Sequence, residues 1–225
     1  MKNKLHTLLC VLIVFMPNRL KIFIYNNFLN ATISPTAKIG FSYINAKRII
    51  IGSHAKIGHL NIIKNIEELQ LGDNGIIGNA IKASAIKLSN HDKFIHAPDR
   101  LPALRIGNHS AIVSRHYFDC NDTITIGNFV TIAGHGSSFF THGINVKNNT
   151  QETGKIVIGN YTMVGTQCVF LKGSKLPNKS VLAANSTMHK PFVEEYGLYS
   201  GVPAIRVKDI PKDSQYFNRS KGVVD

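Results

Sequence analysis

A large apolar residue recurs every six positions along most of this chain, and a glycine usually follows it. A small or β-branched residue often lies four positions further on, as at Ala37, Thr162 and Cys168. A sustained register of six is typical of parallel β-helices, in which each short strand points one side chain at the axis and stacks it on the coils above and below. Ordinary amphipathic strands alternate with a period of two instead. The register is occupied by Ile33, Ile39, Ile51, Ile57, Leu71, Ile77, Ile106, Ile112, Phe118, Ile126, Ile132, Ile158, Val164, Phe170, Leu176 and Leu182.

The repeat divides the chain into three parts. Residues 1–32 form an apolar, basic leader, residues 33–190 hold the coils, and residues 191–225 form a closing segment with three prolines and mixed charge. The coils are interrupted twice, near 83–104 and near 139–156. Long stretches without repeats inside a compact domain usually carry function, so we expect the chemistry in these two loops.

The leader imitates a signal peptide, because Lys2 and Lys4 precede an apolar run over residues 8–16. No small-residue cleavage site follows this run, and it is shorter than the roughly 20 residues needed to span a bilayer. We expect two short helices. They can cap the open end of the solenoid against edge-to-edge pairing, or residues 1–30 can lie on a membrane surface, and the two roles are compatible.

The net charge of +13 favours a polyanionic partner. The basic residues are scattered rather than gathered in a stripe with interleaved aromatics, so we predict a phosphorylated cofactor rather than nucleic acid. The three cysteines lack disulfide or metal-ligand spacing, and Cys120 and Cys168 fit the repeat as small buried side chains. We therefore expect a cytoplasmic protein, at the inner face of the membrane if the leader binds lipid.

The repeats, the segment Phe-Phe-Thr-His-Gly at 139–143 and the segment Gly-Val-Pro-Ala-Ile-Arg at 201–206 together resemble the hexapeptide-repeat acyltransferases. The likeness is greatest to sugar O-acetyltransferases of bacterial polysaccharide biosynthesis, including maltose- and galactoside-acetyltransferase-like enzymes, and covers nearly the whole chain beyond the leader. It implies a left-handed parallel β-helix with three hexapeptides per coil. It also implies a homotrimer that binds acetyl-CoA between adjacent prisms and needs no metal.

The resemblance also assigns residues. The catalytic histidine of the family stands on a projecting loop, and His142 matches that position. The family lines its pantetheine channel with small residues and backbone amides and holds the nucleotide end of the cofactor near the Gly-x-Pro-Ala segment. The corresponding cofactor-binding residues here are Gly165, Thr166, Ala183, Ala184 and Arg206.

The chemistry explains why a histidine is needed. A sugar hydroxyl is a poor nucleophile at neutral pH, whereas a thioester is already activated, so the enzyme needs a base with a pKa near 7. Glu152, Asp119 or a backbone carbonyl is expected to hold the second ring nitrogen of His142. The acceptor-binding candidates are His116 and Asp119 in the preceding coil, His135 in an Ala-Gly-His-Gly corner, and Gln151 on the far side of the loop.

The sequence is compatible with several hypotheses about function. The loop has His142-Gly143 where maltose-type enzymes have a His-Pro pair, which favours a larger glycan, such as a surface polysaccharide or its precursor, over a small free sugar. An N-acyltransferase acting on a nucleotide-linked amino sugar or on a metabolite such as serine is an alternative. A zinc hydratase of the carbonic-anhydrase type needs three converging histidines, and the short histidine pair of that site is missing. A solenoid without catalysis is the remaining alternative.

Overall fold

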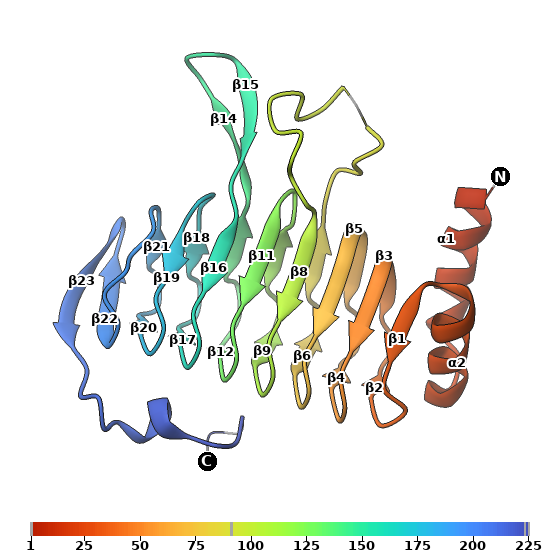
Figure 1. Ribbon diagram of the computed structural model, residues 1–225, viewed down its shortest axis with the longest axis horizontal. Helices are drawn as coiled ribbons and strands as arrows, with labels where there is room; N and C mark the ends of the chain where they lie inside the picture. Colours follow the sequence, from red (N-terminus) through yellow and green to blue (C-terminus); the bar gives the residue numbers. More distant parts are fainter. Residues whose placement is uncertain (1, 91, 223, 225) are drawn as a thin grey trace.

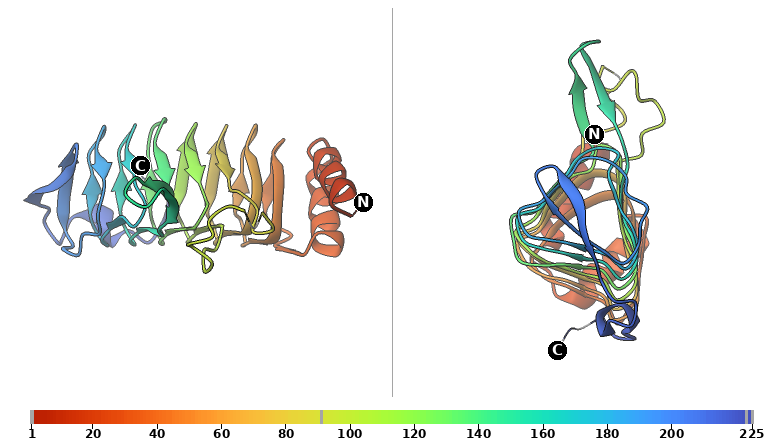
Figure 2. Two further views of the ribbon diagram at one scale, coloured as in Figure 1. Left: turned by 90° about the horizontal axis from the view of Figure 1, so that it is seen from above. Right: turned by 90° about the vertical axis from the view of Figure 1, so that its left-hand side faces the viewer.

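The computed structural model describes residues 2–90, 92–222 and 224. Two helices, α1 (Lys2–Ile13) and α2 (Asn18–Phe28), precede a long three-sided prism of stacked β-coils. Figure 1 shows the prism from the side, and the right-hand view of Figure 2 looks along its axis.

Each face of the prism is a parallel sheet that receives one short strand from every coil. The long strands β3 and β5 bend around a corner and contribute to two faces, with a register shift between Asn45 and Ala46. The first face contains β1 (Ala31–Ile33), the second halves of β3 (Tyr43–Ile51) and β5 (Ile62–Leu71), β8 (Ala103–Ile106), β11 (Thr123–Ile126), β16 (Ile156–Ile158) and β19 (Lys175–Leu176). The second face contains β2 (Lys38–Ile39), β4 (Lys56–Ile57), β6 (Ile76–Asn79), β9 (Ala111–Ser114), β12 (Thr131–Ile132), β17 (Met163–Val164), β20 (Val181–Leu182), β22 (Gly197–Gly201) and the antiparallel β23 (Ala204–Asp209). The third face contains the first halves of β3 and β5, β7 (Lys82–Ser84), β10 (Tyr117–Asp119), β13 (Ser138–Phe140), β18 (Val169–Phe170) and β21 (Thr187–Met188).

The strand register confirms the parallel β-helix predicted from the repeat. Ile39 pairs with Ile57, and Val164 pairs with Leu182, in each case 18 residues later. Every residue of the sixfold register is buried in one continuous core, and so are Cys120 and Cys168, which are free thiols. The coil continues beyond residue 190, because β22 pairs in parallel with β20. The closing segment therefore begins later than the sequence predicted.

The corner between the first and second faces, called the first corner below, is held by a ladder of side-chain amides. The Asn128 Oδ1 accepts the N–H of Asn108, 2.7 Å away, and the Asn160 Oδ1 accepts the N–H of Asn128 at the same distance. A Cβ added at Gly127 would lie 2.5 Å from the Asn160 Oδ1. Glycine follows the buried aliphatic residue here because the amide of the next coil occupies the space.

The helices cover the open edge of the first coil and replace the strand that the edge lacks. Asn26 accepts the N–H of Ile33 at 2.8 Å and donates to its carbonyl at 3.0 Å. Asn18 accepts the N–H of Ile39 at 2.8 Å and donates to the Ala37 carbonyl at 2.9 Å. In the described part of the chain, no helix is both long enough and apolar enough to cross a membrane.

Both interruptions leave the prism at the corner between the third and first faces, called the third corner (Figures 1 and 2). Residues 85–90 and 92–102 are irregular and belong to the loop between β7 and β8, called the 85–102 loop. The second interruption is not a plain loop: β14 (His142–Asn145) and β15 (Thr150–Thr153) pair as an antiparallel hairpin. After β23, a tail containing the 3-10 helix η1 (Gln215–Asn218) runs back along the first corner, where Tyr216 donates to the Thr162 carbonyl at 3.0 Å.

Candidate functional site

His142 is the first residue of the hairpin, and the residue before it ties the hairpin to the prism. The Thr141 hydroxyl donates to the Asp119 carbonyl at 2.7 Å and accepts the N–H of Asp122 at 2.9 Å. Thr141 is fully buried. The start of the hairpin, and with it the backbone of His142, is therefore fixed against the preceding coil.

The His142 imidazole is held by a buried carboxylate. Its Nδ1 lies 2.5 Å from the Asp119 Oδ2, and the Asp119 side chain is only 5% exposed. The Asn121 Nδ2 donates to the other carboxylate oxygen of Asp119 and lies 3.2 Å from the His142 Nδ1. The hydrogen bond to Asp119 raises the pKa of His142, partial burial opposes this effect, and the negative charge of Asp119 adds to it.

The loop over residues 85–102 forms a wall beside this imidazole. The Phe94 ring meets the His142 ring edge-to-face, with the centroids 5.7 Å apart. The Arg100 guanidinium lies 4.5 Å from the Phe94 ring and donates to the carbonyls of Ile86 at 3.0 Å and Asn121 at 3.2 Å. Phe94 and Arg100 are both buried. The loop is thus fastened from inside by one cation.

The other residues predicted near His142 are arranged differently. Glu152 forms an ion pair with Lys172 and accepts a hydrogen bond from Asn145 at 2.6 Å, so it is not the partner of His142. Gln151 lies on β15 opposite Ile144 and is half-buried. Of the two carboxylates expected from the sequence, Asp119 is the one that reaches the ring.

A second group of predicted residues lies at the corner between the second and third faces, called the second corner. His135 is exposed there, and its carbonyl accepts a hydrogen bond from the Thr166 hydroxyl at 2.9 Å. Gly165 packs on the following coil, where an added Cβ would lie 2.6 Å from the N atom of Ala184. Ala183, like Ala184, follows β20 at this corner. One whole face of the prism separates this group from His142.

His116 also belongs to this region, but its ring lies inside the prism with 2% of the residue exposed. Its Nδ1 accepts the N–H of Ser137 at 3.1 Å. Burial, followed by the nearby His135, lowers the pKa of His116 to about 4, so the ring is neutral at pH 7. The geometry gives His116 a packing role and no access to a sugar.

Arg206 lies on β23 at the far end of the prism. Its guanidinium pairs with Glu194 at 3.0 Å and with Asp209. In the described part of the chain, no group of three or more His, Cys, Asp or Glu side chains is arranged to hold a metal ion.

Sequence reasoning missed Asn121, Phe94 and Arg100. An arginine between Pro98 and Pro102 in an otherwise irregular segment is the one available signal, because a loop of that length needs an internal anchor. Nothing in the sequence indicates that Phe94 meets His142, since the contact joins two separate insertions.

No protein-family model and no curated protein sequence matches this chain. Solved structures match its fold. A hexapeptide-repeat acetyltransferase from Vibrio cholerae, complexed with acetyl coenzyme A, has a TM-score of 0.51 and 22% identity, covering 64% of this chain and 72% of that one. The polysialic acid O-acetyltransferase OatWY has a TM-score of 0.51 and 17% identity, covering 83% of this chain and 90% of that one.

A third likeness is to AntD, an N-acyltransferase from Bacillus cereus in complex with dTDP and 3-hydroxybutyryl-CoA. Its TM-score is 0.50 and its identity 16%, covering 84% of this chain and 85% of that one. The resemblance read from the repeats is thus matched by solved structures, and the chain has the fold of the hexapeptide-repeat acyltransferases.

Proposed function

We propose that this chain transfers an acetyl group from acetyl-CoA to a sugar hydroxyl of a bacterial surface polysaccharide or its precursor, with His142 as the general base. The observation that carries the proposal is the pairing of the His142 Nδ1 with the buried Asp119 Oδ2 at 2.5 Å. A histidine held in this way at the base of a projecting hairpin is equipped to take a proton.

The residues of the chain divide the work of proton transfer. Asp119 accepts a hydrogen bond from the Nδ1–H of His142, which leaves the lone pair of Nε2 free. Nε2 takes the proton of the acceptor hydroxyl as its oxygen bonds to the thioester carbonyl carbon and the carbon–sulfur bond breaks. Asp119 stabilises the imidazolium until the proton passes to the departing thiolate. Asn121 holds the second oxygen of Asp119 and so keeps the carboxylate in line.

The second corner suits the narrow arm of the acyl donor. The residues that directly follow β17 and β20 there are small, and a Cβ at Gly134 would come within 2.6 Å of the Thr166 side chain, so the coils pack closely at this corner. We assign Gly165, Thr166, Ala183 and Ala184 to this channel, with His135 at its border. We assign Arg206, whose guanidinium pairs with the exposed carboxylates of Glu194 and Asp209, to the nucleotide end of the cofactor.

The separation of the two corners supports a homotrimer of left-handed prisms. His142 lies at the third corner, whereas the channel residues lie at the second, so one chain does not bring them together. A neighbouring prism whose second corner faces His142 completes the site. Sedimentation velocity tests the assembly, with a trimer expected and a monomer contradicting it. A crystal structure with bound CoA tests the left-handed winding and the groove.

The test of the catalytic proposal is replacement of His142. Thioester loss from acetyl-CoA, followed with a panel of glycans, is expected to fall by about two orders of magnitude or more in His142→Ala. Stabilisation of the fold by acetyl-CoA, measured as the rise in Tm, is expected to persist. His54→Asn, at the exposed first corner, is the control. Normal turnover in His142→Ala contradicts the proposal.

Transfer to nitrogen is the second candidate, and the likeness to an N-acyltransferase favours it. His142 serves an amine as well as a hydroxyl, so the same panel includes amino sugars and serine. Faster acylation of an amine than of any hydroxyl acceptor decides for this candidate.

The outer surfaces of α1 and α2 support contact with the cytoplasmic face of an anionic membrane. Phe15, in the turn between the two helices, is 76% exposed, and Phe23 and Phe28 on α2 are also exposed. Large exposed apolar side chains on a basic protein favour the surface of an anionic bilayer. Because Asn18 and Asn26 cap the coil, the test replaces Phe15 and Phe23 by Gln rather than deleting the leader. Loss of flotation with anionic vesicles is expected, with Val193→Gln unchanged. Unaltered flotation leaves the helices as a cap only.

A further inference from the structure

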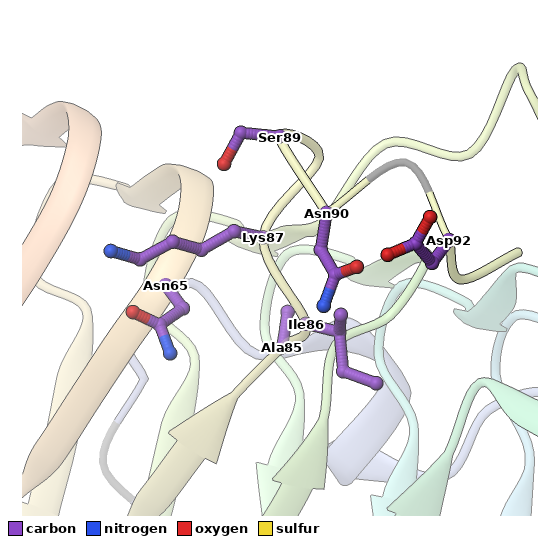
Figure 3. Close-up of a pocket in the computed structure, with 7 residues that line it drawn as sticks. All are labelled: Asn65, Ala85, Ile86, Lys87, Ser89, Asn90 and Asp92. Carbon is purple, nitrogen blue, oxygen red and sulfur yellow. The ribbon is translucent and has the colours of Figure 1, made fainter.

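A polar hollow lies at the third corner, under the loop that also carries Phe94. Its volume is about 640 Å³, and its polar lining comes from Asn65, Lys87, Ser89 and Asn90, with Asp92 at one side (Figure 3). This volume is in the range of pockets that hold small organic ligands. The hollow combines amides, a hydroxyl, an ammonium group and a carboxylate.

The side chains of the hollow have unused hydrogen-bonding capacity. Among the described residues, those of Asn65, Lys87, Ser89 and Asn90 form neither a hydrogen bond nor an ion pair. Two other asparagines of the coil are engaged: Asn61 donates to the Gly78 carbonyl, and Asn128 accepts the N–H of Asn108. Asn65 is half-buried and has a φ of 60°, so a corner position holds its free amide at the hollow.

The hollow is connected to the candidate catalytic residues through one backbone group. Ile86 lines the hollow, and its N–H donates to the Asn121 Oδ1 at 2.9 Å. Asn121 lies 3.2 Å from the His142 Nδ1. Ile86 and Asn121 therefore link the hollow to the histidine.

On its other side the hollow continues toward the helices. A second hollow of about 280 Å³ shares Asn65, Lys87 and Ser89 with the first and extends to His6 on α1. The two form one path along the third corner, from His6 on α1 to Asp92 on the loop that also carries Phe94.

We propose that this path is an acceptor subsite, which holds the sugar residues adjoining the one that is acetylated and extends them toward α1. The inference rests on the proposed function and narrows its substrate class to oligosaccharides. The hollow presents free amides, a hydroxyl and an ammonium group, and these can form hydrogen bonds with the successive hydroxyls of a sugar chain. A monosaccharide bound at His142 does not reach these groups.

The test measures binding against acceptor length. Maltooligosaccharides and α2,8-linked sialic acid oligomers of one to six residues are titrated onto the full-length His142→Ala protein, with saturation-transfer NMR as the readout. Affinity is expected to rise with length in one of the two series. Asn65→Gly, which suits the positive φ, and Lys87→Ala are each expected to weaken binding of the tetrasaccharide about fivefold and to leave that of the monosaccharide unchanged.

Matched variants control for the backbone and for charge. Asn74 has a φ of 55° at the first corner, and Lys56 is an exposed lysine of the second face, so Asn74→Gly and Lys56→Ala are expected to bind like the parent. Affinity independent of length, equal weakening of monosaccharide and tetrasaccharide, or absence of binding in both series overturns the subsite. The thioester assay judges His142 separately: full activity of His142→Ala with intact length dependence removes the base and keeps the subsite.

Discussion

The Asp119 carboxylate and the His142 imidazole come from different coils, yet the Asp119 Oδ2 lies 2.5 Å from the His142 Nδ1. The coil register explains the approach, since Asp119 at the end of β10 pairs with Phe140 at the end of β13, two residues before His142. Stacking alone therefore delivers the carboxylate to the root of the hairpin. The pair joins a residue of the solenoid to the first residue of the hairpin.

Asp119→Asn is expected to move the acid limb of the pH–rate profile. Because Asp119 raises the pKa of His142, the imidazole stays protonated to higher pH, and the neutral base appears only above its ordinary range. The variant shifts the acid limb of kcat/KM to lower pH and lowers the plateau at pH 8.5 about tenfold or more. Glu152→Gln removes the pairing with Lys172 and is expected to leave the limb in place. An unshifted profile in Asp119→Asn contradicts the coupling.

Arg100→Lys is expected to loosen the wall beside His142. The ammonium group of a lysine cannot donate to the carbonyls of Ile86 and Asn121 at the same time, as the guanidinium does. It also lacks the planar surface that stacks on the Phe94 ring. We expect kcat to fall about tenfold, KM for acetyl-CoA to stay constant, and limited proteolysis to cleave within residues 85–102. Arg105 pairs with Glu68 on the first face, away from this loop, so Arg105→Lys serves as the control. Unchanged proteolysis together with unchanged kcat would show that the loop needs no internal anchor.

Asn128→Ala is expected to lower the free energy of unfolding by about 1 kcal/mol, because the N–H of Asn108 loses its acceptor and becomes dependent on water. Urea denaturation provides the measurement. Asn148→Ala, at the exposed end of the hairpin, is expected to change stability by less than about 0.5 kcal/mol. Equal effects of the two substitutions would remove the ladder as a source of stability.

Joint replacement of Asn18 and Asn26 by Ala is expected to uncover the edge of the first coil. Each asparagine satisfies one backbone N–H and one carbonyl, so the loss is about 2 kcal/mol or more. Light scattering is expected to detect self-association through the exposed edge. Asn27→Ala, which removes only a bond to the Phe23 carbonyl within α2, is the comparison. A monodisperse double variant contradicts the capping role.

His116 is expected to make the fold acid-sensitive. Its pKa of about 4 in the folded protein lies below the unfolded value of roughly 6.5, so the unfolded chain takes up the proton first. The contribution is complete above pH 6.5 and is lost as the pH falls toward 4. His116→Asn keeps an acceptor for the Ser137 N–H and is expected to be less stable at pH 7 but flatter between pH 6.5 and 4. An equally steep loss in the variant assigns the acid sensitivity to other groups.

The core was predictable because a period of six determines which residues face the axis of the β-helix. Every aliphatic residue in phase points at the axis, and the small residue four positions later must fit the same narrow section, as Cys168 does. The glycine that follows was expected for a tight corner. Its contact with the amide of the next coil, as between Gly127 and Asn160, requires knowing how the coils stack.

The contacts of the site were only partly predictable. His142 followed from the family likeness, and Asp119 was one of two carboxylates named for its second nitrogen. The meeting of Phe94 with His142 was not predictable, because no periodicity extends into either insertion. The hairpin was not predicted for a similar reason. Thr150 and the residues after it form a strand only by pairing with His142 and its neighbours.

Both insertions begin and end at the third corner, and the strands on either side of them keep their register across the gap: β7 pairs with β10, and β11 with β16. A coil that closes regardless of what leaves this corner is insensitive to the length and content of the excursion. The two insertions can thus differ in length and sequence without changing how the coils stack, because the pairing of the strands holds the coils together. An insertion with a different sequence can therefore be placed at this edge without redesigning the core.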